Sequence, residues 1–449
     1  MTKRLIIVAW MALCAMPAHA ALKIETWKLD NGARVLFVES RSIPMLDVSV
    51  EFDAGARRDP AGKSGTASLT NAMLARGLQA GAAAEAEPAM SEAQISDAFA
   101  DIAAQRGGGV GEDRGGVSLR TLTNAAERDA AVLLLARVLA QPGFPADFLA
   151  RDKARTIAGI KEGLTKPEVI ASRAFSRLLY GSHPYALEPT VASVEAVTRE
   201  DLVAFHRQHY VANRAVIAMI GDITRAQADA IARQLTARLP QGEPLPVLPA
   251  VAPLKAVEER LAHPASQSHI LIGTPAIQRG DPDFFALTVG NYVLGGGGFV
   301  SRLMQEVREK RGLSYSVYSY FDPLAQPGPF QIGLQTSQAQ TNQALQVVRE
   351  TVADFLRSGP TEKELQAAKD NLIGGFPLRI DNNRKILANI AVIGYYGLPL
   401  DYLDTWTANI AKVSRADIQA AFQRKIAVEK LATVVVGNNG VAGGAEGAK

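Results

Sequence analysis

An internal repeat limits the possible folds of this 449-residue chain more than any other feature of its sequence. The hexapeptide Val-Thr-Arg-Glu-Asp-Leu at 197–202 recurs in altered form as Val-Ser-Arg-Ala-Asp-Ile at 413–418, an offset of 216 residues. In each copy a glycine lies 24 residues after the valine and ends an apolar segment; these are Gly221 and Gly437. Two units of this length fill nearly the whole chain, so the sequence predicts a tandem duplication into two homologous lobes.

Hydrophobic patterning inside each half indicates both strands and helices, without the strict alternation of a parallel doubly wound sheet. The chain opens with a hairpin, 24–28 and 35–39, and the Asp-Asn-Gly turn at 30–32 tolerates the positive φ that a tight turn requires. We therefore predict an α+β fold in which helices pack on a mainly antiparallel sheet. The other expected elements are strands at 46–52, 215–220 and 432–436, and helices at 65–76, 91–105, 128–139 and 145–163.

Residues 1–20 have the pattern of an export signal that is cleaved from the mature protein. Lys3 and Arg4 precede an apolar run at 5–15, and Ala-His-Ala at 18–20 places small residues where a signal peptidase cuts. The run is too short to span a membrane, and the alternative interpretation is an apolar first strand. The sequence thus predicts a periplasmic protein without stable membrane insertion.

The rest of the chain divides by composition. We expect a first lobe at 21–238, a linker at 239–256, a second lobe at 257–437 and a tail at 438–449. The tail is rich in glycine and alanine and is predicted to be disordered. The linker is predicted to be stiff and extended because five prolines crowd into fourteen residues, at Pro240, Pro244, Pro246, Pro249 and Pro253.

Charge and cysteine content exclude several classes of protein. The net charge of +3 is too close to balance for a protein whose main partner is nucleic acid. Cleavage of the signal lowers the number of Lys and Arg residues from 48 to 46, against 45 Asp and Glu, and leaves a net charge of +1. The one cysteine, Cys14, lies within the signal, so we expect neither a disulfide framework nor a thiolate metal site in the mature chain.

Two glycine motifs that could bind ligands lack the neighbours that such sites require. Gly-Lys-Ser at 62–64 resembles the end of a phosphate-binding loop, but the position five residues before its glycine is Arg57. The glycine-rich segment 107–116 carries Glu112 and Asp113, and we interpret it as a hairpin rather than a calcium loop.

Candidate histidine and serine sites are equally incomplete. His206 and His209 lie three residues apart on a predicted helix, but no further ligand makes a recognised metal site, so we place them at the surface or an interface. His183 is interpreted as part of a turn. Ser68 lacks the flanking glycines of a nucleophile elbow.

The stretch Asp-Pro-Ala-Gly-Lys-Ser-Gly-Thr-Ala at 59–67 resembles the lead-in to the zinc helix of the pitrilysin and insulinase-like metallopeptidases, which include the mitochondrial processing peptidases. In active members His-x-x-Glu-His follows, with both histidines on zinc and the glutamate as general base. The matching residues here are Ser-Leu-Thr-Asn-Ala at 68–72, and a third ligand, a glutamate on a later helix, matches Gly159. Since these side chains cannot assemble a three-ligand zinc site, the resemblance implies a degenerate site without metal at Ser68, Asn71, Ala72 and Gly159.

The resemblance covers nearly the whole mature chain. Segments 179–185 and 210–222 are similar to the family's stretch after the third ligand and to the strand that closes its first lobe. It implies a processing-peptidase-like fold, also known from LuxS, in which each lobe is built from duplicated αβ subdomains.

The second lobe resembles another part of the family's machinery. Family members carry an arginine and, seven residues later, a tyrosine on a helix-to-strand turn, and these hydrogen-bond the substrate carbonyl and the tetrahedral intermediate. Arg308 and Tyr315 have this spacing, after a helix expected from about 299 to 310. The resemblance implies that they act as oxyanion donors, although the charged run 306–311 alone would indicate a solvated helix face.

Two glycine-rich segments are expected near the peptide. Gly295, Gly296, Gly297 and Gly298 give either a flexible backbone before a helix or a substrate-contacting loop, shorter than the similar loop of the non-catalytic processing-peptidase subunit. Segment 107–116 matches the region where active relatives present an edge strand, to which a peptide could add.

These features together lead to one function and one alternative. A chain without zinc ligands or general base that retains Arg308 and Tyr315 is expected to be the non-catalytic subunit of a heteromeric zinc metalloendopeptidase. It would carry no cofactor of its own, and its partner would be a homologous subunit that holds zinc. The alternative is a catalytically dead peptide-binding or scaffold protein, like the core subunits of the respiratory cytochrome complex that share this fold.

Overall fold

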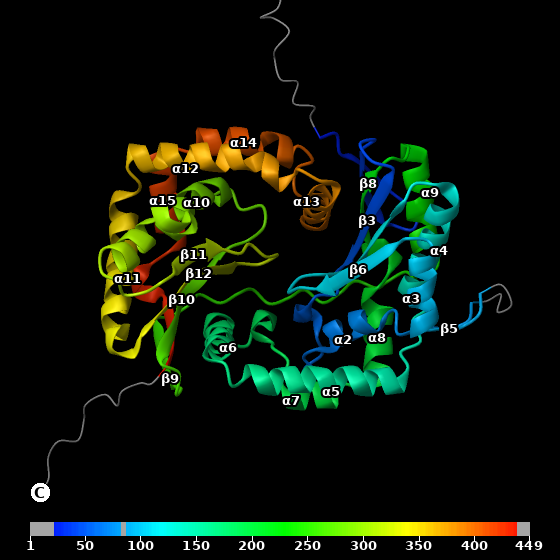
Figure 1. Cartoon of the computed structure of the whole chain (residues 1–449), viewed down its shortest axis with the longest axis horizontal. Coiled ribbons are helices and arrows are strands. Elements are labelled where there is room, and N and C mark those ends of the chain that lie inside the picture. The colour runs from blue at the N-terminus through cyan, green and yellow to red at the C-terminus, as the bar shows by residue number, and fades with distance from the viewer. Residues whose placement is uncertain (1–21, 82–86, 438–449) are drawn as a thin grey trace, which may run out of the picture.

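The computed structural model of the chain describes residues 22–81 and 87–437, so the expected export signal and the expected tail lie outside the described residues. Two large β-sheets stand at opposite sides of the molecule, and helices run between them above and below (Figure 1). Each half of the sequence contributes one large sheet. The α+β class and the two lobes are confirmed, and the duplication is seen at the level of these lobes.

The first sheet is mixed and has six strands in the order β1-β2-β8-β3-β7-β6. Only β2 and β8 run parallel; all other neighbours are antiparallel. The hairpin at the start of the chain forms as predicted, with Gly32 at φ +91° and so close to Asn213 that a Cβ would not fit. The strands are β1 (Glu25–Lys28), β2 (Arg34–Glu39), β3 (Met45–Phe52), β6 (Gln105–Val110), β7 (Gly115–Leu122) and β8 (Val216–Gly221).

Helices cover the face of this sheet that carries Val48, Val50, Val117 and Leu119. One of them, α3, ends four residues before the expected Gln105, because Ala103 adopts φ +50° and Gln105 already begins β6. The helices are α2 (Thr66–Met73), α3 (Glu92–Asp101), α4 (Ala125–Ala140), α8 (Arg199–His209) and α9 (Arg225–Thr236).

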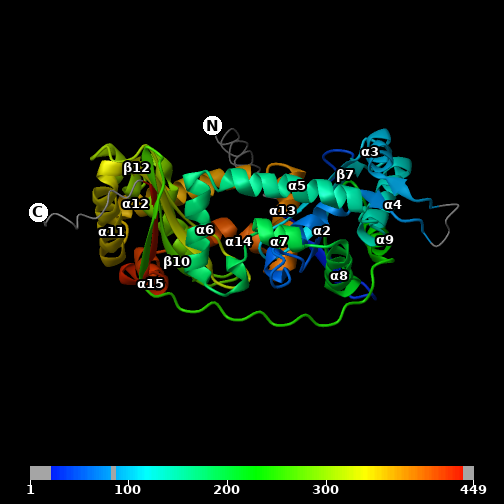
Figure 2. The same ribbon diagram turned by 90° about the horizontal axis from the view of Figure 1, so that it is seen from below.

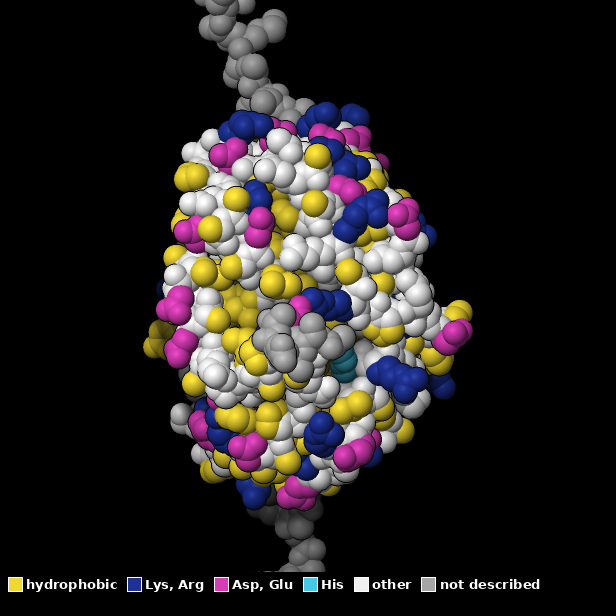
Figure 3. All heavy atoms as spheres, turned by 90° about the vertical axis from the view of Figure 1, so that its right-hand side faces the viewer, with side chains coloured by type: hydrophobic (Ala, Val, Ile, Leu, Met, Phe, Trp, Pro, Cys, Tyr) yellow, Lys and Arg dark blue, Asp and Glu magenta, His cyan; other side chains and the backbone are white. Residues whose placement is uncertain are grey.

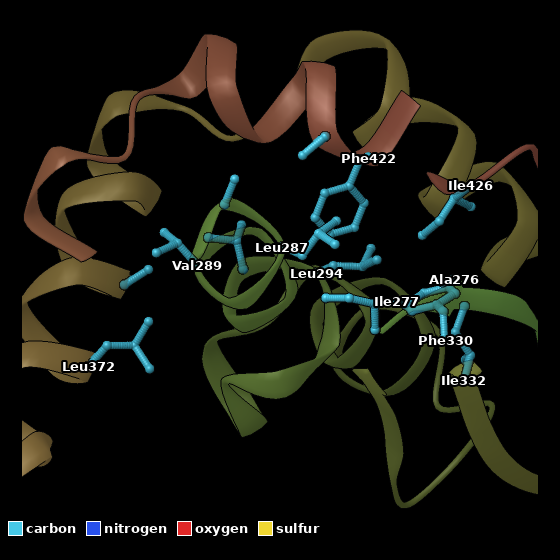
Figure 4. Packing of buried hydrophobic residues seen from close by; sticks show 14 of the residues in the cluster. Ala276, Ile277, Leu287, Val289, Leu294, Phe330, Ile332, Leu372, Phe422 and Ile426 are labelled. Carbon is cyan, nitrogen blue, oxygen red and sulfur yellow. The ribbon is translucent and has the colours of Figure 1, made fainter. Parts of the chain in front are cut away.

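The second sheet has five strands in the order β11-β12-β10-β13-β9, and only β13 and β9 run parallel. Phe330 and Ile332 of β12 belong to the same buried hydrophobic core as Leu287 and Phe422 (Figure 4). The strands are β9 (Val257–Ala262), β10 (Gln267–Ile277), β11 (Val317–Phe321), β12 (Gly328–Ser337) and β13 (Ala432–Gly437). The covering helices are α10 (Phe284–Asn291), α11 (Thr341–Ser358), α12 (Glu362–Gly375), α14 (Tyr402–Lys412) and α15 (Arg415–Lys425).

The repeated hexapeptide forms the same local structure in both lobes. The Thr198 hydroxyl accepts a hydrogen bond from the Asp201 N–H, and the Asp201 carboxylate accepts one from the Thr198 N–H, which caps α8. Ser414 and Asp417 make the same reciprocal bonds at the start of α15. Each capped helix leads into a parallel-paired strand, β8 or β13.

Each sheet is completed by a helix from the other half of the chain. α6 (Pro167–Tyr180) packs on β10 and β13 of the second sheet, where Gly273 leaves room for the ring of Phe175. α13 (Asn383–Tyr396) packs on β2, β3 and β8 of the first sheet, and Gly394 lies against Leu36 and Val216. α5 (Ala146–Gly163) and α7 (Val191–Ala196) run along the lower edge between the sheets in Figure 1. The lobes therefore interlock.

Residues 240–256 have no regular secondary structure and cross from one lobe to the other along one face of the molecule (Figure 2). Some of their contacts are polar: the Pro249 carbonyl lies 3.0 Å from Nε2 of His183 and accepts a 2.8 Å hydrogen bond from the side-chain amide of Gln326. Leu254 packs on the hydrophobic cluster between α6 and the second sheet. Val247 is 96% exposed, so the middle of this segment is open to solvent.

Basic and acidic side chains are interspersed on the surface at the end of the molecule formed by α3, α4 and α9 (Figure 3). No helix of the described ranges combines the length and hydrophobicity needed to cross a bilayer.

Candidate functional site

The helix that matches the family's zinc helix is α2, and Asp59 fixes its start. The Asp59 carboxylate accepts hydrogen bonds from the N–H groups of Gly65 (2.6 Å) and Ala67 (2.7 Å), and Gly65 has φ +105°. Burial raises the pKa of Asp59 to about 6, although both hydrogen bonds lower it. The lead-in sequence thus fixes the start of a helix, a structural role that requires no metal ligand.

The four positions matched to ligands and base lie on two contacting helices, α2 and α5. Ser68 and Ala72 are exposed, one turn apart on α2, and a Cβ on Gly159 of α5 would meet nothing within 4 Å. The Asn71 amide donates to the Gly116 carbonyl (2.9 Å) and to the Tyr210 hydroxyl (3.1 Å), so it serves packing.

These residues do not fit a zinc ion. They offer one hydroxyl, one amide, one methyl group and one hydrogen, whereas zinc sites use imidazole, thiolate and carboxylate. Within residues 22–81 and 87–437, no three His, Cys, Asp or Glu side chains lie close enough together to hold a metal ion.

β6 forms one of the two edges of the first sheet and lies beside α2. Its Gly107, Gly108 and Gly109 leave the edge almost without side chains, and a Cβ at Gly109 would meet nothing within 4 Å. Glycine at an open, unstrained strand position is typical of sites where another backbone approaches closely. The segment is the hairpin that the sequence predicts, with its outer strand at an edge.

Arg308 and Tyr315 line one cavity of about 430 Å³, together with Gln267 and Gln335 of the second sheet. The Arg308 guanidinium carbon lies 4.7 Å from the centre of the Phe299 ring, and its Nε lies 3.6 Å from a carboxylate oxygen of Glu309. Tyr315 is 86% exposed. Both donors therefore face open space on the same wall. In the described part of the chain no hydrogen bond or ion pair joins them to the degenerate positions.

The segment before this pair differs from the expected helix at 299–310. It forms a 3₁₀ turn at 298–300 and then π-helical hydrogen bonds at 304–309. Gly295 is buried, with room for no Cβ beside Ser319, so packing requires it and it does not present a peptide-contacting surface. Gly296 and Gly298 are exposed, Gly297 is half-buried, and Gly298 has φ +61°.

A buried network around Asp113, which sequence patterning did not reveal, joins the two lobes. Its carboxylate accepts hydrogen bonds from Arg57 (2.5 Å), the Tyr185 hydroxyl (2.6 Å), the Tyr396 hydroxyl (2.7 Å) and the Ala325 N–H (2.7 Å). Burial lowers the pKa of Arg57, but nearby oxygens including those of Asp113 outweigh this and raise it. These donors occupy the carboxylate, which excludes the calcium interpretation. No sequence spacing signals a network whose members lie 56 to 283 residues apart.

His183, His206 and His209 have structural roles, and the prediction that places His209 at the surface or an interface is wrong. His209 is buried, and its Nδ1 lies 2.8 Å from the Asp53 carbonyl; burial lowers its pKa to about 4. His206 Nε2 lies 2.7 Å from the Leu139 carbonyl. The sequence did not predict that this side of α8 faces inward, because it does not show that both imidazole rings lie within hydrogen-bond distance of backbone carbonyls. His183 does stand at a turn, where its Nδ1 accepts from the Tyr185 N–H.

Comparison with known proteins identifies a family that the chain matches. A model described as the peptidase M16 inactive domain matches residues 196–372. The crystal structure of a peptidase M16 inactive domain from Pseudomonas fluorescens is 38% identical, superposes with a TM-score of 0.87, and the match covers 93% of this chain and 98% of that one.

Curated relatives carry two kinds of name. A protein of Helicobacter pylori named a non-peptidase homolog is 26% identical over 90% of this chain and 91% of its own length. An uncharacterized zinc protease of Mycobacterium leprae is 32% identical, but the match spans 50% of this chain and about half, 52%, of that protein.

Proposed function

Because this chain belongs to the peptidase M16 family as an inactive member, we propose that it is the zinc-free subunit of a heteromeric metalloendopeptidase that hydrolyses peptides in the periplasm. The partner is a homologous chain that holds zinc, which activates a water for attack on the peptide bond. The observation that carries the proposal is that Arg308 and the exposed Tyr315 share one cavity while the matched ligand positions are Ser68, Ala72 and Gly159.

The pair suits the charge that develops during peptide hydrolysis. A guanidinium and a phenol are hydrogen-bond donors, and donors held in place before reaction stabilise an oxyanion without reorganisation. Arg308 meets this condition, because it lies over the Phe299 ring and close to Glu309. The Tyr315 hydroxyl is exposed and makes no hydrogen bond within the described ranges, so it becomes fixed only when it donates to a substrate on the partner. The exposed Gly298 directly precedes Phe299, whose ring lies under Arg308, and suits a close approach of peptide backbone.

The test uses the chain purified alone and together with an exported homologue that has an intact His-x-x-Glu-His motif. We expect the lone chain to bind no stoichiometric zinc and to leave peptides intact, and the mixture to cleave them. In that mixture Arg308→Ala and Tyr315→Phe should each lower kcat/KM by about 100- to 1,000-fold, the cost of one lost oxyanion donor.

Arg311→Ala is the matched control, because Arg311 follows closely in the same segment but pairs with Glu306. Its complex should keep full activity. Zinc-dependent turnover by the lone chain, or unchanged kcat/KM in both variants, would overturn the proposal. Peptide binding without turnover in every mixture would favour the scaffold alternative. N-terminal sequencing of the exported protein should begin near Ala21.

A further inference from the structure

An ion-pair network joins α2 and α5, the two helices that carry the matched metal positions. Arg76, in the turn after α2, pairs with Asp152 of α5 at 3.1 Å and with Glu92 of α3. Arg151 pairs with the same two carboxylates, at 3.2 Å and 3.3 Å, and Arg155 lies 3.5 Å from Asp152. Three guanidinium groups thus share two carboxylates, which leaves the network with a net charge of +1.

This network borders the matched metal positions. Asp152, Arg155 and Gly159 lie on one side of α5, because residues three or four apart are neighbours on a helix surface. Ala72 lies four residues before Arg76, on the other helix of the same ion pair. A Cβ on Gly159 would meet nothing within 4 Å, and Ala72 is exposed. A ligand can therefore approach the network from the side of these two positions.

A fourth arginine, Arg106 of β6, lies next to the network. It pairs with Leu119 across the strands, and residues directly opposite in an antiparallel pair share a face, so its side chain lies on the helix-covered face of the sheet. On that face β6 contacts α2 and α3. Partial burial lowers the pKa of Arg106, and the positive charge of Arg76 lowers it further, so the two guanidinium groups lie near each other.

The charge of Arg106 has no partner in the described part of the chain. Its side chain is exposed and makes no hydrogen bond or ion pair with residues 22–81 or 87–437. With Arg106 included, four arginines stand against two carboxylates, and the net charge of the cluster is +2. A carboxylate suits this cluster, because the planar guanidinium group can bind both carboxylate oxygens at once.

We propose that Arg106, together with this network, binds a carboxylate group of a peptide beside Ala72 and Gly159. The carboxylate is either the C-terminus of the peptide or an aspartate or glutamate side chain, since both present the same planar anion. The positive charge that this surface offers to a peptide comes from guanidinium groups of the chain itself. The inference takes from the proposed function only that peptides reach the first lobe.

The test measures peptide binding to the full-length chain alone, by isothermal titration calorimetry. One probe is acetyl-Ala-Ser-Ala-Ser-Ala with a free C-terminal carboxylate, and the second is the same peptide as its uncharged amide. The third is the amide with glutamate at the central position. We expect at least one carboxylate peptide to bind about fivefold or more tightly than the uncharged amide, and the difference to shrink as salt is raised.

The peptide that gains affinity identifies the source of the carboxylate. A gain with the free C-terminus alone assigns the site to peptide ends, and a gain with the central glutamate alone assigns it to acidic side chains. Equal affinities of all three peptides, or no measurable binding of any of them, would overturn the proposal.

Variants locate the discrimination. Arg106→Gln should bring the preferred peptide to the affinity of the uncharged amide, whereas Arg106→Lys, which keeps the charge but not the planar fork, should keep part of the preference. Arg207→Gln is the matched control, because Arg207 is an exposed arginine of α8 that makes no ion pair among the described residues. A preference that survives Arg106→Gln, or that Arg207→Gln abolishes equally, would refute the assignment.

Thermal unfolding separates a binding role of Arg106 from a structural one. Arg106→Gln should leave the midpoint of unfolding unchanged or raise it, because the substitution breaks no contact of the guanidinium and removes its repulsion from Arg76. A lower midpoint would show that the side chain serves packing and would contradict the proposal.

This experiment fails separately from the proposed function. Binding to the lone chain requires no partner and no cleavage. A carboxylate preference with no effect of Arg308→Ala on cleavage would refute the oxyanion role alone. A normal effect of Arg308→Ala without a carboxylate preference would refute the role of Arg106 alone.

Discussion

Asp113 carries more structural consequence than any residue that the sequence predicted to form the candidate site. It sits at the tip of the β6–β7 hairpin, and its partners come from both lobes: Arg57 and Tyr185 from the first, Ala325 and Tyr396 from the second. It is 2% exposed, so its charge is compensated by protein groups alone. A buried carboxylate with four donors holds the free edge strand at a fixed position relative to the second lobe.

We expect Asp113→Asn to lower the free energy of unfolding by about 3–5 kcal/mol, because it removes one partner of a buried ion pair and turns an amide towards other donors. Urea denaturation followed by circular dichroism measures this. Asp354→Asn is the control, since Asp354 pairs with Arg357 at the exposed surface and should change stability by less than about 1 kcal/mol. Equal stabilities of the two variants would show that the network does not hold the lobes.

Among the helices and strands, the sequence predicted the features that depend on residues close together in the chain. The Thr198–Asp201 and Ser414–Asp417 capping boxes are local, and the hexapeptides that contain them revealed the repeat. The end of α3 was misplaced because Ala103 adopts a left-handed conformation that its residue type does not indicate. The crossing of α6 and α13 to opposite sheets depends on packing between distant segments, which hydrophobic periodicity does not contain.

The same limit applies to the candidate site. The absence of zinc ligands at Ser68 and Ala72, and the spacing of Arg308 and Tyr315, are visible in the sequence. The cavity beside Tyr315 is not, because it arises where α6 leaves part of the second sheet uncovered.

Alanine substitutions at two helical glycines should change the free energy of unfolding in opposite directions. In Gly159→Ala the new methyl group on α5 meets open space, so the gain in helix propensity should raise stability by about 0.5–1 kcal/mol. In Gly394→Ala the methyl group would lie 2.5 Å from Leu36 Cδ1 and 2.7 Å from Val216 Cγ1, so overpacking should cost about 1–3 kcal/mol. Thermal and urea unfolding measure both.

Gly374→Ala is the control for propensity alone, because a Cβ on that exposed helical position of α12 also meets nothing within 4 Å. It should behave like Gly159→Ala. A stabilising Gly394→Ala would mean that α13 does not pack tightly on the first sheet.

The whole molecule is held together by more than its linker. α6 and α13 each bury one face on the sheet of the opposite lobe. The Asp113 network adds hydrogen bonds between the two lobes. The linker adds polar contacts such as those of Pro249, while Val247 is open to solvent. Covalent continuity at the linker is therefore not what keeps the lobes in place.

We expect the two lobes to stay associated after the linker is cut. A protease site inserted after Val247 allows cleavage in the open part of the linker, and the two fragments should co-elute in gel filtration without denaturant. Because the exchanged helices couple the lobes, they should also unfold together. After cleavage the midpoint of unfolding should rise with protein concentration, since association has become bimolecular.

Trp27 on β1 and Trp406 on α14 report the two lobes separately, because they are the two tryptophans outside the expected signal. In the Trp406→Phe variant the fluorescence of Trp27 reports unfolding of the first lobe. In the Trp27→Phe variant the fluorescence of Trp406 reports unfolding of the second lobe. The uncut protein with the same insertion is the control, and its two probes should give one urea transition, as should those of the cut protein. Fragments that separate in buffer, or probes whose transitions differ in the uncut protein, would show that the lobes are independent units joined only by the linker.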